Sequence, residues 1–166
     1  MKNRSRNLNQ KGFSLIELLI VVAIILIIAA IAIPNLLQAR VAANEASAVA
    51  SLRTINTAQI TYNSSYPTVG FASSLSALSG TSCDTPDSSG ACLIDTLLAS
   101  GNKSGYNFTS VAVGPAPVGG YLATGLPSGT NGNRSFCTTE DGTIHYDSTG
   151  APIPNHDSCV SLSPLQ

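Results

Sequence analysis

The chain has 166 residues, enough for one ordinary domain, and only 10% of them are charged. Its net charge of -1 conceals a split: residues 1–12 carry four basic and no acidic residues, and the rest carry four basic and nine acidic ones. Phosphate contacts need clustered Lys and Arg, so this balance argues against a nucleic-acid-binding surface.

Residues 1–12 form a short, polar and basic leader. Basic residues next to an apolar segment keep that end on the cytoplasmic side of a membrane. Residues 13–33 follow, and they are apolar apart from Ser14 and Glu17. As a helix this stretch would be roughly 31 Å long, which matches the hydrocarbon core of a bilayer.

A secretory signal peptide is the alternative interpretation, because the sequence "AIA" at Ala30–Ala32 resembles a small-residue cleavage site that would leave Ile33 as the first residue. The apolar run is slightly long for such a peptide, and the acidic Glu17 at its start is not part of that design.

Residues 34–66 continue in helix-compatible residues, so we expect one long helix from about Phe13 to Tyr62. Pro34 predicts a kink or a locally unwound turn, because it lacks an amide donor and clashes with the preceding turn. The spacing predicts an apolar face formed by Ala46, Val49, Leu52 and Ile55. The polar residues expected to lie largely off it are Gln38, Asn44, Glu45, Ser51 and Gln59.

Residues 67–166 carry short apolar patches separated by Gly, Pro, Ser and Asn, which predicts an antiparallel sheet covered on one face by the helix. The expected strands are Tyr106–Val113, Tyr121–Leu126, Arg134–Thr139 and Thr143–Asp147. A short helix is expected near Leu93–Ala99. The predicted fold class is therefore α+β.

Four cysteines lie in this C-terminal part, and their even number indicates two disulfides formed in an oxidising compartment. Four cysteines allow three pairings, and the sequence alone does not choose among them. We favour Cys83 with Cys92 and Cys137 with Cys159. Metal binding is the less favoured alternative, because no Cys-x-x-Cys spacing is present.

The other residues that could bind phosphate or metal, or act in catalysis, do not form a recognisable site. "SGNKSG" around Lys103 lacks the first glycine of a phosphate loop and is interpreted as a solvated turn. His145 and His156 are expected at the surface or in turns, and Asp141 and Asp147 lack the spacing of a calcium loop. We therefore predict no enzyme activity, cofactor or metal. Asn-x-Ser/Thr triplets begin at Asn63, Asn102, Asn107 and Asn133, and such triplets arise by chance in a chain of this composition.

Residues 11–40, "KGFSLIELLIVVAIILIIAAIAIPNLLQAR", closely resemble the N-terminus of type IV pilins and the related pseudopilins. The resemblance rests on Lys11 and Gly12 before Phe13, on Glu17, and on an apolar run that ends at Pro34. It is strong over about residues 11–55 and weaker over the sheet, where only Asn133–Ile144 looks like the family's later strands.

The resemblance implies a type IV pilin fold and a specific set of roles. Prepilin peptidase would cut between Gly12 and Phe13 and methylate the new amino group of Phe13. Glu17 would pair with the N-terminus of a neighbouring subunit in a homo-oligomeric helical filament, while the apolar helices pack together. Pro34 would let the helix bend once it leaves the lipid. An assembly ATPase and a platform protein would extract the subunit from the cytoplasmic membrane into an extracellular pilus.

Two other functions compete with a pilus subunit. One is a pseudopilin of a type II secretion system, whose N-terminal helix would look alike. The other is a membrane-anchored extracytoplasmic binding protein, for which Glu17 would be dispensable.

Overall fold

The structure is a computed structural model that describes residues 12–80 and 83–165. The predicted leader therefore lies outside the described residues, apart from Gly12. The chain divides into two compact units, residues 1–38 and 39–166. The division falls inside the first helix, four residues beyond Pro34.

Helix α1 spans Leu15–Ser65 and confirms the long N-terminal helix expected from the sequence. The helix is unbroken at Pro34, so no unwound turn is present there. Up to Gln38 almost every residue of α1 is exposed, and its buried residues all lie in the second unit.

The second unit contains an antiparallel sheet in which six strands follow one another in chain order, so each strand is hydrogen-bonded to the next. The strands are β1 (Asn102–Lys103), β2 (Tyr106–Val113), β3 (Gly120–Pro127), β4 (Ser135–Thr139), β5 (Ile144–Asp147) and β6 (Ser163–Pro164). The four longer strands confirm those expected from the sequence. The two-residue edge strands β1 and β6 were not expected, because two residues are too few to show an alternating pattern.

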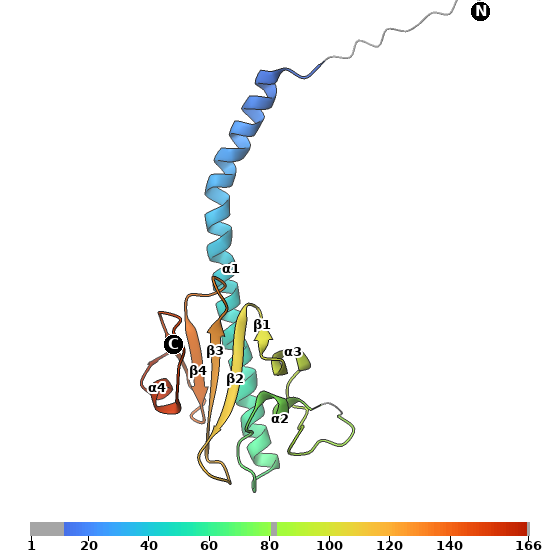
Figure 1. Ribbon diagram of the computed structural model, residues 1–166, viewed down its shortest axis with the longest axis vertical. Helices are drawn as coiled ribbons and strands as arrows, with labels where there is room; N and C mark the ends of the chain where they lie inside the picture. The colour runs from blue at the N-terminus through green and yellow to red at the C-terminus, as the bar shows by residue number, and fades with distance from the viewer. Residues whose placement is uncertain (1–11, 81–82, 166) are drawn as a thin grey trace, which may run out of the picture. The chain divides into compact units, whose positions relative to one another are not determined.

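Within this unit, α1 covers one face of the sheet (Figure 1). Alternate residues of β2 point to opposite faces, so Tyr106, Phe108 and Ser110 are buried while Thr109 and Val111 are exposed. The main core forms where the buried side chains of the sheet meet those of α1. It includes Leu52, Ile55, Tyr62, Phe71, Leu78, Leu98, Tyr106, Phe108, Tyr121 and Phe136.

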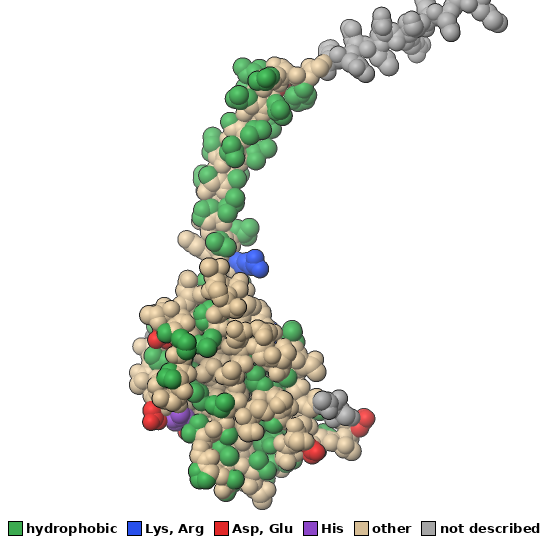
Figure 2. Space-filling model, in the orientation of Figure 1, with side chains coloured by type: hydrophobic (Ala, Val, Ile, Leu, Met, Phe, Trp, Pro, Cys, Tyr) green, Lys and Arg blue, Asp and Glu red, His purple; other side chains and the backbone are tan. Residues whose placement is uncertain are grey.

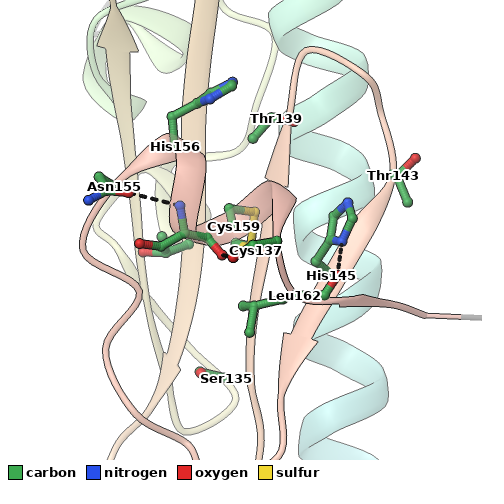
Figure 3. Close-up of a disulfide and its surroundings, with 12 residues drawn as sticks. Ser135, Cys137, Thr139, Thr143, His145, Asn155, His156, Cys159 and Leu162 are labelled. Atoms are coloured by element: carbon green, nitrogen blue, oxygen red, sulfur yellow. Dashed lines mark hydrogen bonds between the residues drawn. A yellow bond between two sulfur atoms is a disulfide. The ribbon is translucent and has the colours of Figure 1, made fainter.

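The C-terminal segment covers part of the other face. A second, smaller apolar cluster there contains Leu122 of β3, Cys137 of β4, Ile153 and Cys159. The disulfide Cys137–Cys159 lies inside it, next to His145 and Leu162 (Figure 3). This segment covers Leu122 and Cys137, whereas Val111 of β2 stays 47% exposed.

Three short helices complete the second unit. They are α2 (Leu75–Ser79), α3 (Thr96–Ala99) and α4 (His156–Val160). Each begins with a side chain that accepts a hydrogen bond from a first-turn amide, and these capping residues are Ser74, Asp95 and Asn155. Helix α3 lies within the region where a short helix was expected, whereas α2 and α4 were missed.

The predicted face of the second half of α1 is partly wrong. Glu45, Ser51 and Gln59 were placed off the buried face and are buried, whereas Ala46 was placed on it and is exposed. For Glu45 and Gln59 the reason is that the sheet and its loops supply hydrogen-bond partners. Gln59 donates from Nε2 to the carbonyl of Ala72 and accepts at Oε1 from the amide of the same residue. Both ends of its buried side-chain amide are therefore hydrogen-bonded.

Candidate functional site

The peptide bond proposed for cleavage lies at the exposed start of the described chain. Gly12 and Phe13 are both exposed, with Phe13 at 81%, and no atom lies within 4 Å of where a Cβ of Gly12 would be. A protease must bring its own groups close to the backbone on either side of the bond that it cuts. Nothing in the described residues blocks that approach here.

Glu17 lies in the first turn of α1, where its carboxylate has a local partner. The backbone amide of Ser14 donates to Glu17 Oε2 at 3.0 Å. This is the glutamate half of a capping box, in which the residue three positions into the helix reaches back to the amide of the capping residue. Glu17 thus fixes the start of the helix within one chain, and the bond uses one of its two oxygens.

The surface around Glu17 is apolar and uncovered. Residues 13–38 contain no other charged side chain, and the side chains of this part of α1 are almost all hydrophobic (Figure 2). Seventeen large apolar side chains between Phe13 and Leu37 are at least 47% exposed. Burying each contributes about 1.5–3 kcal/mol, so together they outweigh a single ion pair several times over.

By length and composition, α1 is able to cross a membrane. Its most apolar window of 18 residues has a mean hydropathy of 3.3 and none of it is buried. A signal sequence near an N-terminus meets the same criterion. Pro34 follows this apolar stretch within an intact helix.

A second charged cluster holds α1 to the sheet inside the second unit. Glu45, only 7% exposed, accepts from the backbone amides of Asn133 and Arg134 at 2.9 and 3.2 Å. The Arg134 guanidinium adds contacts of 2.9 Å from Nε and 2.7 Å from Nη2. Burial alone would raise the pKa of Glu45, but these donors and the positive charge bring it below its ordinary value.

The Arg134 guanidinium lies over two rings, 5.4 Å from the centre of Phe136 and 5.5 Å from that of Tyr146. Tyr106 donates its hydroxyl to the Arg134 carbonyl at 2.8 Å, and burial raises the pKa of Tyr106 to about 12. The sequence did not predict the contacts of Glu45 with the sheet, because its polarity favours a place off the buried face. Its spacing from Leu52, Ile55 and Tyr62 places it on that face.

The other residues considered from the sequence for phosphate or metal binding or catalysis lie at separate places in the fold. Lys103 lies in β1, with its amine 3.7 Å from Asp95. His145 is buried in β5, which corrects its expected surface position, and its Nδ1 lies 2.8 Å from the Leu162 carbonyl (Figure 3). The expected position was wrong because the C-terminal segment covers this face of the sheet.

His156 begins α4, and its Nε2 lies 3.0 Å from both carboxylate oxygens of Glu140. Asp141 and Asp147 accept hydrogen bonds from the backbone amides two residues ahead, Thr143 and Thr149. Within residues 12–80 and 83–165, no group of three His, Cys, Asp or Glu side chains could hold a metal ion.

Both disulfides join the pairs favoured from the sequence, Cys83 with Cys92 and Cys137 with Cys159. Cys83 is exposed, in a loop whose residues 83–89 are all exposed. Cys137 and Cys159 are both fully buried. Of the four Asn-x-Ser/Thr triplets that follow the apolar run, those at Asn102, Asn107 and Asn133 have an exposed asparagine, and Asn63 is half-buried.

Comparison with known proteins places the similarity in the N-terminal part. Residues 7–33 match the family model of the prokaryotic N-terminal methylation motif. A stretch of 44 residues, 26% of this chain, is 64% identical to the type IV wide pilus major component PilA4 of Thermus thermophilus. A stretch of 53 residues, 32% of this chain, is 49% identical to the type IV major pilin protein PilA of Myxococcus xanthus. The matches cover 34% and 24% of the length of these two relatives.

Proposed function

We propose that this chain is a structural subunit of a type IV pilus, because it has the prepilin motif and the α+β fold of the type IV pilins. Both relatives are described as pilus components, which favours a pilus over a secretion pseudopilus and a structural role over a catalytic one. The proposal depends most on one observation: a single carboxylate, Glu17, lies at the head of an uncovered apolar helix.

In this proposal the chain is first a single-pass protein of the cytoplasmic membrane, with its basic leader on the cytoplasmic side. Prepilin peptidase cuts between Gly12 and Phe13, and Phe13 becomes the N-methylated first residue. The cut removes the basic leader and creates a free amine next to the helix start. An assembly ATPase and a platform protein then move the subunit into the extracellular filament.

Glu17 then acts as the selective contact of assembly. A carboxylate in apolar surroundings costs several kcal/mol unless a cation or hydrogen-bond donors compensate it. In the single chain the Ser14 amide occupies Oε2, and the other oxygen is available for the Phe13 amine of a neighbouring subunit. The exposed apolar side chains supply most of the adhesion, and the ion pair sets the axial register of one helix against the next.

Three substitutions separate the two roles of Glu17. Glu17→Ala removes both the cap and the charge, whereas Glu17→Gln keeps an oxygen that accepts from Ser14 but has no charge. Ser14→Pro removes the amide donor and leaves the Glu17 charge in place, and Ser14→Ala is its control because it also loses the hydroxyl but keeps that donor. The readout is the yield of sheared surface filaments, with the subunit identified by mass spectrometry.

We expect Glu17→Ala and Glu17→Gln to abolish filaments. Normal filaments from Glu17→Gln would show that capping is enough and would refute the charge pairing. The mass of the N-terminal peptide tests processing separately. N-methylated Phe13 is expected, whereas an unprocessed Met1 or a start at Ile33 would contradict the proposal.

A further inference from the structure

The outer face of the sheet, opposite α1, has an uncovered apolar hollow. Its floor is formed by Val111 and Val113 of β2 and by Leu122 of β3. Val111 and Val113 are 47% and 36% exposed, because the C-terminal segment covers β3 and β4 but stops short of β2. In Figure 2 green side chains gather on this face of the second unit.

The rim of this hollow is acidic. Residues 154–157 form one wall, and the whole hollow measures about 340 Å³. The side chain of Asp157 is fully exposed, at 101%, and makes only a 3.4 Å contact with His156. Glu140, which binds the other side of His156, is also exposed, at 37%. The two carboxylates face one imidazole, so the rim keeps a negative charge whether or not His156 is protonated.

The opposite side of the same unit presents a cation. The described residues include four Arg and Lys side chains. Two of them form ion pairs, Lys103 with Asp95 and Arg134 with Glu45. Arg53 is exposed and makes no ion pair among the described residues. It borders a shallow groove on the surface of α1 whose other lining residues are Thr54, Thr57, Ala58, Thr61 and Leu93.

We propose that these two surfaces are one interface between copies of this chain: the hollow beside Asp157 in one subunit receives the exposed Arg53 side chain of another. The two surfaces carry opposite charge and lie on opposite faces of the sheet. A contact between two different patches is heterologous, and repeated without closure it builds a helical filament. This inference rests on the proposed function and adds to it a specific contact between globular domains.

Charge reversal tests the contact in the full chain, expressed in cells that assemble the filament. Arg53→Glu and Asp157→Arg should each lower the yield of sheared filaments at least about fivefold, since each places like charges together. Combining them restores opposite charges and should return the yield to within about twofold of the unmodified chain. Arg40→Glu makes the same charge change at the other exposed arginine of α1 and should leave the yield within about twofold. Near-UV circular dichroism checks that each variant folds.

A crosslink provides a second readout. In the Arg53→Lys variant, which keeps the cation, carbodiimide should join the new amine to Asp157 of another copy. The product should run as dimers and higher multimers on a denaturing gel, and peptide mass spectrometry should identify the joined residues.

The outcomes separate this inference from the proposed function. If the unmodified chain forms no filaments, the proposed function fails. If filaments form but neither charge reversal lowers their yield, or the double variant is no better than the worse single one, only the interface is overturned. Rescue of an Arg40→Glu defect by Asp157→Arg would show a net-charge effect and would also overturn it.

Discussion

Replacing Glu45 with Leu should destabilise the second unit by about 2–3 kcal/mol. The side chain is buried, and its removal leaves the amides of Asn133 and Arg134 without their acceptor and Arg134 without its counter-charge. Breaking a fully buried pair costs roughly 3–5 kcal/mol. We expect a smaller cost here, about 2–3 kcal/mol, because the Arg134 side chain is 38% exposed and is partly solvated. Glu45→Gln should cost less, about 1–2 kcal/mol, because its oxygen still accepts from the two amides.

The same pair predicts a pH dependence with a definite sign. The pKa of Glu45 is lowered in the folded chain from its ordinary value of 4.5. The stability gained from the carboxylate is therefore fully present above that ordinary value and is lost as the pH falls through the lower, folded pKa. Glu45→Gln should remove this part of the acid sensitivity.

Guanidinium unfolding of the full chain in detergent micelles measures both effects, with near-UV circular dichroism of the core tyrosines as the signal. Asp157→Asn is the control, because that carboxylate is fully exposed and should change stability by less than about 0.5 kcal/mol. The reasoning is refuted if Glu45→Leu is as stable as the unmodified chain, or if Glu45→Gln retains the whole acid dependence.

Three further predictions concern the second unit. Gln59→Leu should cost about 2–4 kcal/mol in the same unfolding assay, because Ala72 and Ser110 lose buried hydrogen-bond partners. Burial lowers the pKa of His156, but the contacts with the Glu140 and Asp157 carboxylates outweigh this effect, so the pKa is raised overall. The stability that His156 gives α4 is therefore present below its unfolded pKa and is lost as the pH rises through the higher, folded pKa. Hydrogen exchange of the α4 amides should show this loss, and His156→Gln should abolish its pH dependence. Replacing Cys137 and Cys159 together by Ser should cost about 3.4 kcal/mol on chain entropy, against about 2.7 for Cys83 and Cys92, and equal costs in unfolding would contradict the loop-length argument.

The long helix and the four main strands were predictable because each has a strong local pattern. Residues 13–33 are too apolar for a loop, and the strand Tyr106–Val113 agrees with β2 residue for residue. The two edge strands and α4 were not predictable. Each has two to five residues, and its partners lie elsewhere in the chain.

The buried polar residues show a different limit. Glu45 and Gln59 have side chains that usually stay in water, so their helical spacing was outweighed by their polarity. Their burial depends on donors and acceptors at Ala72, Ser110, Asn133 and Arg134, which lie 13 to 89 residues away. Only the folded sheet brings those groups together. The hydrogen bond from Ser14 to Glu17 is the opposite case, since the spacing S-x-x-E is visible in the sequence itself.

The position of Cys159 also has a consequence for how the molecule matures. Its partner Cys137 lies 22 residues earlier, in β4, and the stretch between them includes the whole of β5 and most of α4. In a chain that enters an oxidising compartment from its N-terminal side, the nine-residue separation of Cys83 and Cys92 allows that bond to close while β4 is still arriving. The second bond waits for α4, so we expect pulse-labelled chains trapped with a thiol-alkylating reagent to acquire Cys83–Cys92 first. Buried Cys137–Cys159 would then distinguish a fully exported subunit from one still in transit, and the reverse order of oxidation would contradict this.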